Sequence, residues 1–221
     1  MKKLLCLVVT MAFLMTVPLT GCGDNTAAIQ APVDGFITAL QQGDIEGVKA
    51  NVKEEAFAEN GAFSGFGDIE NIDEILAKEV NLNVSDLSDK TKAAIDDYVQ
   101  TMMKNMVKSY EIKDVKEESD SVGKVTASVT FGFDPEAAGK VDVNAEVEQM
   151  ATDYMNANMA ELTNIYMTGG QTALMQKVLD DLVEDILDLY TDAVMKTGET
   201  TQDVTFVVEK VDDKWLISGE E

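Results

Sequence analysis

The chain of 221 residues contains no histidine and only two cysteines, Cys6 and Cys22. Catalysis by Ser–His or Cys–His pairs needs an imidazole, and the common zinc and iron sites need imidazole or thiolate ligands. These classes of site are therefore excluded, and we expect no catalytic residue, no metal site and no cofactor. A copper(I) site made of thioethers alone is disfavoured for the same reason. Carboxylates, tyrosines, lysines and thioethers are the groups left for chemistry.

Positive charge is also scarce, because 17 basic residues stand against 41 acidic ones, which gives a formal net charge of −24. Such a surface repels nucleic acid and anionic lipid headgroups, and salt screens this repulsion without reversing it. We therefore expect no nucleic-acid partner, and no basic patch that would hold the protein on a membrane.

The longest apolar run lies at the N-terminus, where Lys2 and Lys3 precede residues 4–17. A charged start, an apolar stretch and small residues before a cleavage site are typical of a secretory signal peptide. The run is too short for a comfortable transmembrane helix, which needs about 20 apolar residues. Removal of residues 1–21 would lower the net charge from −24 to −26. The remaining length suits one domain.

The predicted leader ends in Leu19-Thr20-Gly21-Cys22, which resembles the lipobox of bacterial lipoproteins. The resemblance implies that the leader is cleaved before Cys22 and that this cysteine is diacylated. It also implies that the lipid on Cys22 attaches the protein to the extracytoplasmic side of the cell membrane. Residues 22–30 would then be the lipidated cysteine and a tether, and residues 31–221 a single α+β domain.

The rest of the sequence changes between the periods of helices and strands. An apolar face recurs every three to four residues over residues 29–40, which predicts a helix with Pro32 in its first turn. Gly43 is expected to end this helix and Asp44 to cap the next one. A longer helix is predicted over residues 89–108. Strands are predicted at residues 110–116, 125–133, 204–208 and 214–217, with a hairpin turn at Asp212-Asp213.

Two long helical segments separate the second predicted strand from the third. They cover residues 141–168 and 171–196, and Gly169-Gly170 lies between them. The order of elements predicts an α+β fold, with N-terminal helices packed on a four-stranded antiparallel sheet. The helical pair at residues 141–196 is then an insertion between the two hairpins.

Residues 36–44 and 207–217, near the two ends of the mature chain, resemble parts of cone-shaped domains like nuclear transport factor 2. Residues 36–44, Phe-Ile-Thr-Ala-Leu-Gln-Gln-Gly-Asp, are similar to the opening helix and turn of that family. Residues 207–217, Val-Val-Glu-Lys-Val-Asp-Asp-Lys-Trp-Leu-Ile, are similar to its closing hairpin. Lipoproteins of Gram-positive bacteria often carry such domains, many of them without an assigned function. The resemblance implies a cone in which relatives bind ligands, and a helical insertion that covers or fills it.

Methionines on the predicted helices are the main candidates for a binding surface. The segment 141–168 carries one stripe at Val147, Met150, Ala151 and Tyr154, and a second, rotated stripe that begins at Met155. A helix that is apolar on two sides is either enclosed in the core, the favoured interpretation, or presents one side to a ligand or partner. The candidate ligand-binding or partner-binding residues are Met155, Met159, Leu162, Tyr166, Met102 and Met106.

A row of carboxylates follows the second inserted helix. Asp181, Asp185, Asp188 and Asp192 recur at steps of four, three and four residues and share one face. Calcium sites usually need oxygens that converge from a loop, and this spacing is not that of an EF-hand. We interpret the row as the solvated face of an amphipathic helix, in preference to a site for calcium or a cationic partner.

Three functions remain open from the sequence. The favoured one is a lipid-anchored, extracytoplasmic, non-catalytic binding or interaction module, whose partner is a small apolar or cationic ligand or an envelope protein. The second is a small enzyme that uses carboxylate and tyrosine chemistry. Asp96, Asp97, Tyr98, Tyr154 and Tyr166 supply the residue types for it, although core packing is the favoured role of the tyrosines. The third is a structural envelope protein without a pocket.

Overall fold

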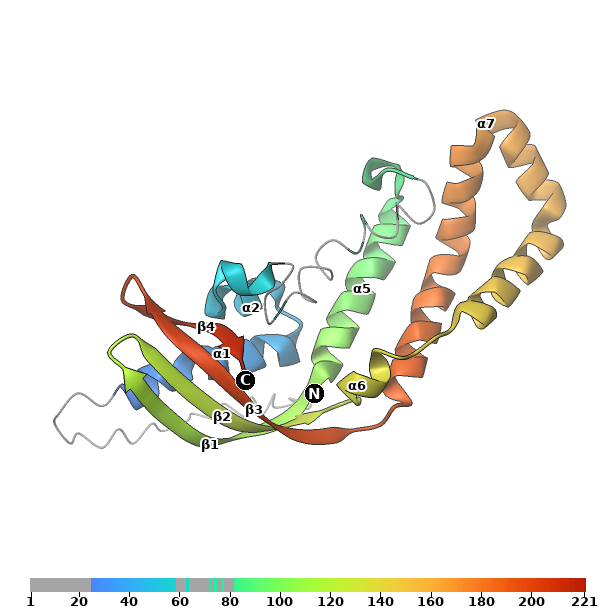
Figure 1. Cartoon of the computed structure of the whole chain (residues 1–221). Helices are drawn as coiled ribbons and strands as arrows, with labels where there is room; N and C mark the ends of the chain where they lie inside the picture. The colour runs from blue at the N-terminus through green and yellow to red at the C-terminus, as the bar shows by residue number, and fades with distance from the viewer. Residues whose placement is uncertain (1–24, 59–62, 64–71, 73, 75–76, 78–81) are drawn as a thin grey trace, which may run out of the picture.

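The computed structural model describes residues 25–58, 63, 72, 74, 77 and 82–221. Cys22 and the predicted signal peptide lie outside these residues. The elements, in chain order, are α1 (Thr26–Gln42), α2 (Ile45–Asn51), η1 (Glu54–Phe57), η2 (Val84–Asp86), α5 (Asp89–Met106), β1 (Val107–Ser119), β2 (Val122–Phe131), α6 (Pro135–Ala138), α7 (Asn144–Met195), β3 (Thr200–Val211) and β4 (Lys214–Glu220). Figure 1 shows their arrangement.

The four strands form one antiparallel sheet in the order β1-β2-β3-β4. β1 and β2 make one hairpin, and β3 and β4 make another. β2 pairs directly with β3, although the inserted helices separate the two strands in the sequence. The turn between β3 and β4 is the expected Asp212-Asp213, and both residues have positive φ, at 46° and 64°, as a two-residue hairpin turn requires. The predicted α+β fold class is therefore confirmed.

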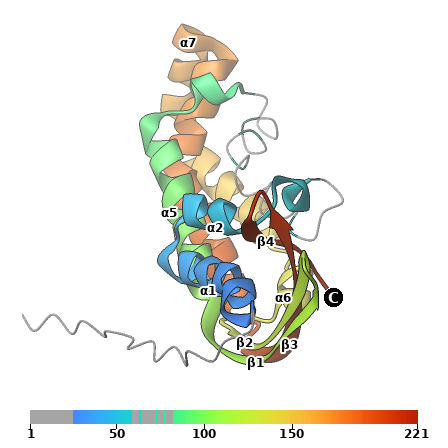
Figure 2. The same cartoon turned by 90° about the vertical axis from the view of Figure 1, so that its left-hand side faces the viewer.

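α1 lies against the concave face of the sheet (Figure 2). Its apolar stripe is buried, with Ile29, Val33 and Ile37 at most 1% exposed. On the facing strand β2, Val125 and Val129 are buried because alternate residues of a strand share one face. This contact between α1 and the sheet is the centre of the core.

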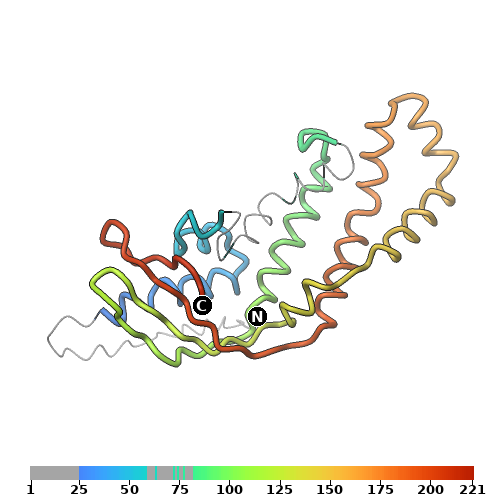
Figure 3. Tube along the Cα trace, viewed as in Figure 1, coloured from blue at the N-terminus to red at the C-terminus, as the bar shows by residue number. Residues whose placement is uncertain are grey.

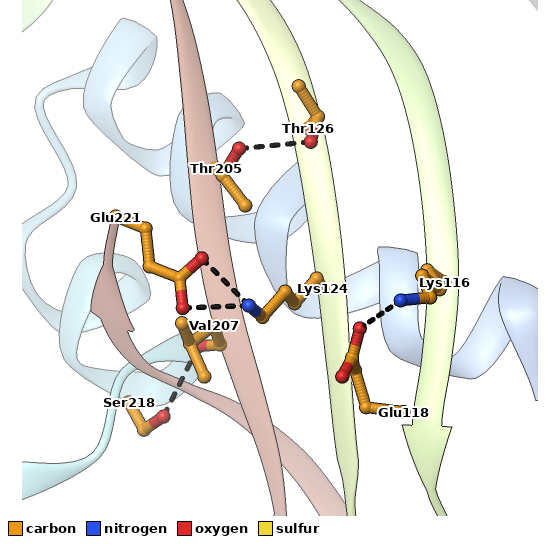
Figure 4. Close-up of polar contacts among 8 residues, drawn as sticks. All are labelled: Lys116, Glu118, Lys124, Thr126, Thr205, Val207, Ser218 and Glu221. Atoms are coloured by element: carbon orange, nitrogen blue, oxygen red, sulfur yellow. Dashed lines mark hydrogen bonds and ion pairs between the residues drawn. The ribbon is translucent and has the colours of Figure 1, made fainter.

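The opposite face of the sheet is polar (Figure 4). Lys124 Nζ lies 2.7 Å from Glu221 Oε1, and the hydroxyls of Thr126 and Thr205 lie 3.0 Å apart across β2 and β3. Lys116 is placed opposite Lys124 in the β1–β2 register, and its ammonium pairs with Glu118 at 2.5 Å. The sheet therefore has one apolar face, toward α1, and one face that carries cross-strand polar pairs.

The first helix begins earlier than expected. α1 starts at Thr26, so the residues from Thr26 to Gln30, expected as tether, are helical and Pro32 lies well inside the helix. The prediction of Pro32 in the first turn is wrong. Ile29 is fully buried, and its packing accounts for a helix that extends past a residue without an amide proton. Gly43 has the predicted left-handed φ of 71°, and Asp44 accepts the predicted capping hydrogen bond from the amide of Gly47.

The inserted helices form a long hairpin, which we call the arm and define as α7, Asn144–Met195. Figures 1 and 3 show the arm projecting from the sheet, with its second half beside α5 and its first half on the outside. The chain reverses at Gly170, where φ is 74° and ψ is −167°. The predicted break at Gly169-Gly170 is confirmed.

We expect Gly170→Ala to lower the free energy of unfolding by about 1–3 kcal/mol, measured by thermal or urea denaturation. A β-carbon at this position would meet nothing within 4 Å, so the cost comes from a backbone conformation that is open essentially to glycine alone. Gly139→Ala is the matched control, since Gly139 has a φ of −65° and its nearest neighbour would be 3.6 Å away. Equal stability of the two variants would contradict the prediction.

Candidate functional site

A cavity of about 150 Å³ lies between α1 and the sheet. The described residues that line it come from α1, from the end of α5, from all four strands and from position 63, which lies outside these elements, and none comes from the arm. They are Phe36, Ile37, Leu40, Phe63, Met106, Val107, Val129, Phe131, Val204, Phe206 and Glu220. The inserted helices therefore do not fill this space, which the sequence left undecided.

The aromatic rings around the cavity hold one another in place. The ring centroid of Phe36, on α1, lies 5.3 Å from that of Phe63, and the two ring planes are tilted by 53°. The ring of Phe206, on β3, meets Phe36 edge-on, with the centroids 6.0 Å apart. Such tilted and edge-to-face pairs stabilise a ring beyond the effect of its buried area. The residues of β2 and β3 reach the cavity because they alternate toward the concave face. The wall is thus largely apolar, and three of its aromatic rings contact one another.

Glu220 is the one charged residue among the described residues of the wall, and a β-bulge places it there. In the β3–β4 register, Val208 faces Ile217 and Val207 faces Gly219, and the irregularity between them brings Glu220 opposite Phe206. Regular alternation from Ile217 would have turned Glu220 to the polar face, and bulges commonly redirect a side chain in this way. The exposed carboxylate therefore lies at the rim of an apolar cavity.

The composition of the wall defines what the cavity can hold. The cavity is partly open to solvent, and an apolar space of about this volume is large enough for a molecule such as benzene. A carboxylate at the rim adds attraction for one positive charge. No group of three Asp, Glu, Cys or His side chains that could hold a metal ion occurs among the described residues. The geometry suits a small apolar ligand with one cationic end.

A second hollow, of about 420 Å³, is an open groove between α5 and the second half of the arm. It brings together Asp97 and Tyr98, two of the residues that a carboxylate-and-tyrosine enzyme would use, with Glu184 and Asp188. Burial raises the pKa of Tyr98. Tyr154 and Tyr166 do not line this groove, and Asp96 lines a different hollow beside α2. The residues that a carboxylate-and-tyrosine enzyme would use therefore do not share one cavity.

The two halves of the arm are joined by polar contacts. Tyr154, in the first half, donates a hydrogen bond to Asp181 Oδ2 at 2.6 Å, and Lys177 lies 2.7 Å from the same oxygen. Lost hydration, followed by the hydrogen bond to Asp181, raises the pKa of Tyr154 to about 12. The hydrogen bonds from Lys177 and Tyr154 hold the pKa of Asp181 below its usual value. Asp181 is therefore a structural link as well as a member of the predicted solvated row.

Asp180 attaches the arm to α5. Its Oδ1 accepts hydrogen bonds from the hydroxyl of Ser88, which caps α5, and from the hydroxyl of Thr91 at 2.6 Å. Thr91 is fully buried, and Lys90 donates from its ammonium to the backbone oxygen of Asp180 at 2.6 Å. Leu179 and Val183 are buried in the main core on the same side of the helix. We call Ser88, Thr91 and Asp180 the latch.

The six candidate binding residues are not brought together. Met106 lines the cavity, and Met102 is half-buried on α5. Leu162 is 7% exposed and lies outside the main core. Met155, Met159 and Tyr166 are 48%, 61% and 55% exposed. The favoured core interpretation is therefore wrong for these three side chains, because the arm has no further layer over its outer side among the described residues.

Two features of the site were missed in the sequence. Glu220 reaches the cavity only through a bulge, which leaves no signal in the strand pattern. Asp180 immediately precedes the acidic row, and its role depends on the contact with α5 rather than on helical periodicity. The N-cap of α5 could have been identified from the sequence, since a serine directly before a predicted helix start, here Ser88, is typical of an N-cap.

No helix among the described residues is both long enough and apolar enough to cross a membrane. No family model matches the chain, and no curated protein matches it either. Among solved structures, the chain is similar to an NTF-2-like protein of unknown function from Shewanella oneidensis MR-1. The likeness has a TM-score of 0.38 and 11% identity, and covers 89% of this chain and 97% of the other. At this level of similarity, nothing about fold, ligand or activity follows from it.

Proposed function

We propose that the protein is a lipid-anchored, extracytoplasmic, non-catalytic binding module that holds a small apolar ligand with one cationic end. The observation that carries the proposal is the cavity of about 150 Å³ on the concave face of the sheet, with Glu220 at its rim as the one carboxylate among the described residues of the wall. Small-molecule sites are commonly concave, mostly apolar and provided with a few polar groups that fix orientation. The wall has this composition.

The sequence supports the non-catalytic part of the proposal. The chain has no histidine, and Cys22, its one cysteine after the predicted leader, would be consumed by the lipid. The described wall of the cavity contains no tyrosine, lysine or second carboxylate to share acid–base chemistry with Glu220. Ligand binding without turnover therefore needs no acid–base group other than those in the described wall, whereas catalysis would need a second one.

The position of α1 fits an anchor at Cys22. Asn25, immediately before α1, donates a hydrogen bond to Glu117 Oε1 at 2.6 Å, close to the turn of the β1–β2 hairpin. The arm leaves the sheet from the other end of β2 (Figure 1). An acyl chain on Cys22 would thus hold the hairpin end of the sheet near the membrane and leave the arm directed away from it.

Native mass spectrometry of the protein purified from its own host is the direct test. A small molecule that co-purifies at one copy per chain, and is lost on unfolding, would support the proposal and give the ligand class. A bare chain that also fails to bind benzylamine and toluene would overturn it. These two probes have an aromatic ring small enough for the cavity, and only benzylamine carries a positive charge.

We expect Val204→Phe to abolish binding of both benzylamine and toluene, measured by calorimetry or NMR titration, because the larger side chain fills the cavity. Val207→Phe is the matched control, since Val207 belongs to the same strand and to the polar face of the sheet (Figure 4). Glu220→Gln should weaken benzylamine about 2- to 5-fold, as for an exposed ion pair, and leave toluene unchanged. Binding that survives Val204→Phe would place the ligand elsewhere.

A further inference from the structure

Exposed apolar side chains are concentrated on one part of the molecule. Five large hydrophobic side chains are exposed among the described residues, and four of them lie in the first half of the arm. They are Met155, Met159, Tyr166 and Met167, with exposed fractions of 48%, 61%, 55% and 79%. We call these four the outer face. Isolated exposed apolar residues are ordinary, whereas Met155, Met159 and Tyr166 lie within about 40° of one another around the helix axis and form a surface, with Met167 beside them near the tip.

The outer face is distinct from the side that closes the arm. The inner side of the first half contains Tyr154, whose hydroxyl donates a hydrogen bond to Asp181 on the second half. Lys177 also lies 3.6 Å from Glu161 across the two halves. Closure of the hairpin therefore accounts for the inner side, and it leaves Met155, Met159 and Tyr166 without a role in the fold.

The charges around the outer face indicate the chemistry of its partner. Residues 144–170 contain four acidic side chains, Glu146, Glu148, Asp153 and Glu161, and no basic one. Residues 162–176, around the tip, contain no charge at all in a chain whose net charge is −24. A second copy of the chain, or an anionic lipid surface, would bring like charges together. A basic partner would instead be attracted by the field and meet an apolar centre.

We propose that the outer face is a docking surface for a basic amphipathic helical segment of another protein. Met155, Met159 and Tyr166 are at positions i, i+4 and i+11, which lie on one face of a helix, and the apolar face of a second amphipathic helix can pack on such a face. Methionine side chains adapt to irregular apolar partners, and the acidic residues at the base of the arm pair with lysines or arginines at the edge of the partner. This inference goes beyond ligand binding in the cavity and does not depend on it.

The test uses the full chain and an 18-residue synthetic peptide with leucines on one face and lysines on the other. Calorimetry should show binding that the variant Met155→Ser/Met159→Ser/Tyr166→Ser/Met167→Ser weakens about 10-fold or more. Val211→Ser, at the fifth exposed apolar residue, is the matched control and should bind as the unchanged protein does. Equal binding by the fourfold variant would overturn the proposal, because net charge alone would then explain the attraction.

Two further measurements keep the result decisive. Met159→Lys changes one exposed residue, which the fold does not need, and should repel the basic peptide while leaving the helical circular dichroism unchanged. Sedimentation velocity should give a monomer, and vesicles of phosphatidylglycerol should not bind the Cys22→Ala variant of the chain. A dimer or a vesicle complex that the fourfold variant loses would overturn the proposal in favour of that other occupant.

Discussion

Replacement of Cys22 by alanine is expected to abolish lipid labelling of the protein and to release it from the membrane fraction. Two acyl chains give stable anchoring, because each buried methylene contributes about 0.8 kcal/mol. Without them we expect no other attachment, since the domain left after removal of residues 1–21 would carry a net charge of −26 and be repelled by anionic headgroups. Growth with radioactive palmitate, followed by fractionation, measures both effects. The fold should be unchanged, because α1 begins only at Thr26.

Cys6→Ala is the matched control for this experiment. Cys6 lies in the apolar run of the predicted leader, so its replacement removes the other thiol of the chain without touching the site of lipidation. This variant should keep the label and remain in the membrane fraction. The lipobox interpretation is wrong if the Cys22→Ala protein still sediments with membranes after intact-mass measurement shows that residues 1–21 have been removed.

The part of the fold that could be predicted is the part set by local periodicity. Val125, Ala127 and Val129 alternate with polar residues, and the structure buries all three. Gly43 and the Asp212-Asp213 turn need positive φ, which few sequences satisfy, and each was identified from residue type alone. The strand and turn signals were reliable because each depends on neighbours within a few residues.

The candidate site was harder to predict because it depends on contacts between distant segments. Phe36, Val129 and Phe206 were each identifiable as core residues, yet no pattern shows that their packing leaves a cavity. The interpretation of the outer stripe of the arm as core was wrong for a different reason. Periodicity shows that Met159 shares a side of the helix with Met155, and it cannot show whether another layer covers that side. A helix in an insertion has fewer neighbours than the same pattern would have in a central layer.

We expect Asp180→Ala to be among the most destabilising single changes on the arm. Asp180 accepts hydrogen bonds from two hydroxyls, and the loss of this acceptor leaves Thr91, which is fully buried, without its partner on the arm. Hydrogen bonds to a charged group contribute about 1.5–3 kcal/mol, and an unsatisfied buried hydroxyl adds its own desolvation cost. The free energy of unfolding, from urea denaturation, should therefore fall by about 2–4 kcal/mol.

A double-mutant cycle shows whether this loss belongs to the latch. Thr91→Val removes the buried hydroxyl at nearly constant shape, so Asp180→Ala should cost about 1–2 kcal/mol less in the Thr91→Val background than alone. Asp185→Ala, at an exposed position of the same helix, should change stability by less than about 0.5 kcal/mol. Additive losses at Thr91 and Asp180 would mean that the two side chains act independently, and the attachment of the arm would then depend on Leu179 and Val183. A coupled loss would assign that attachment to one buried polar contact at the capped end of α5.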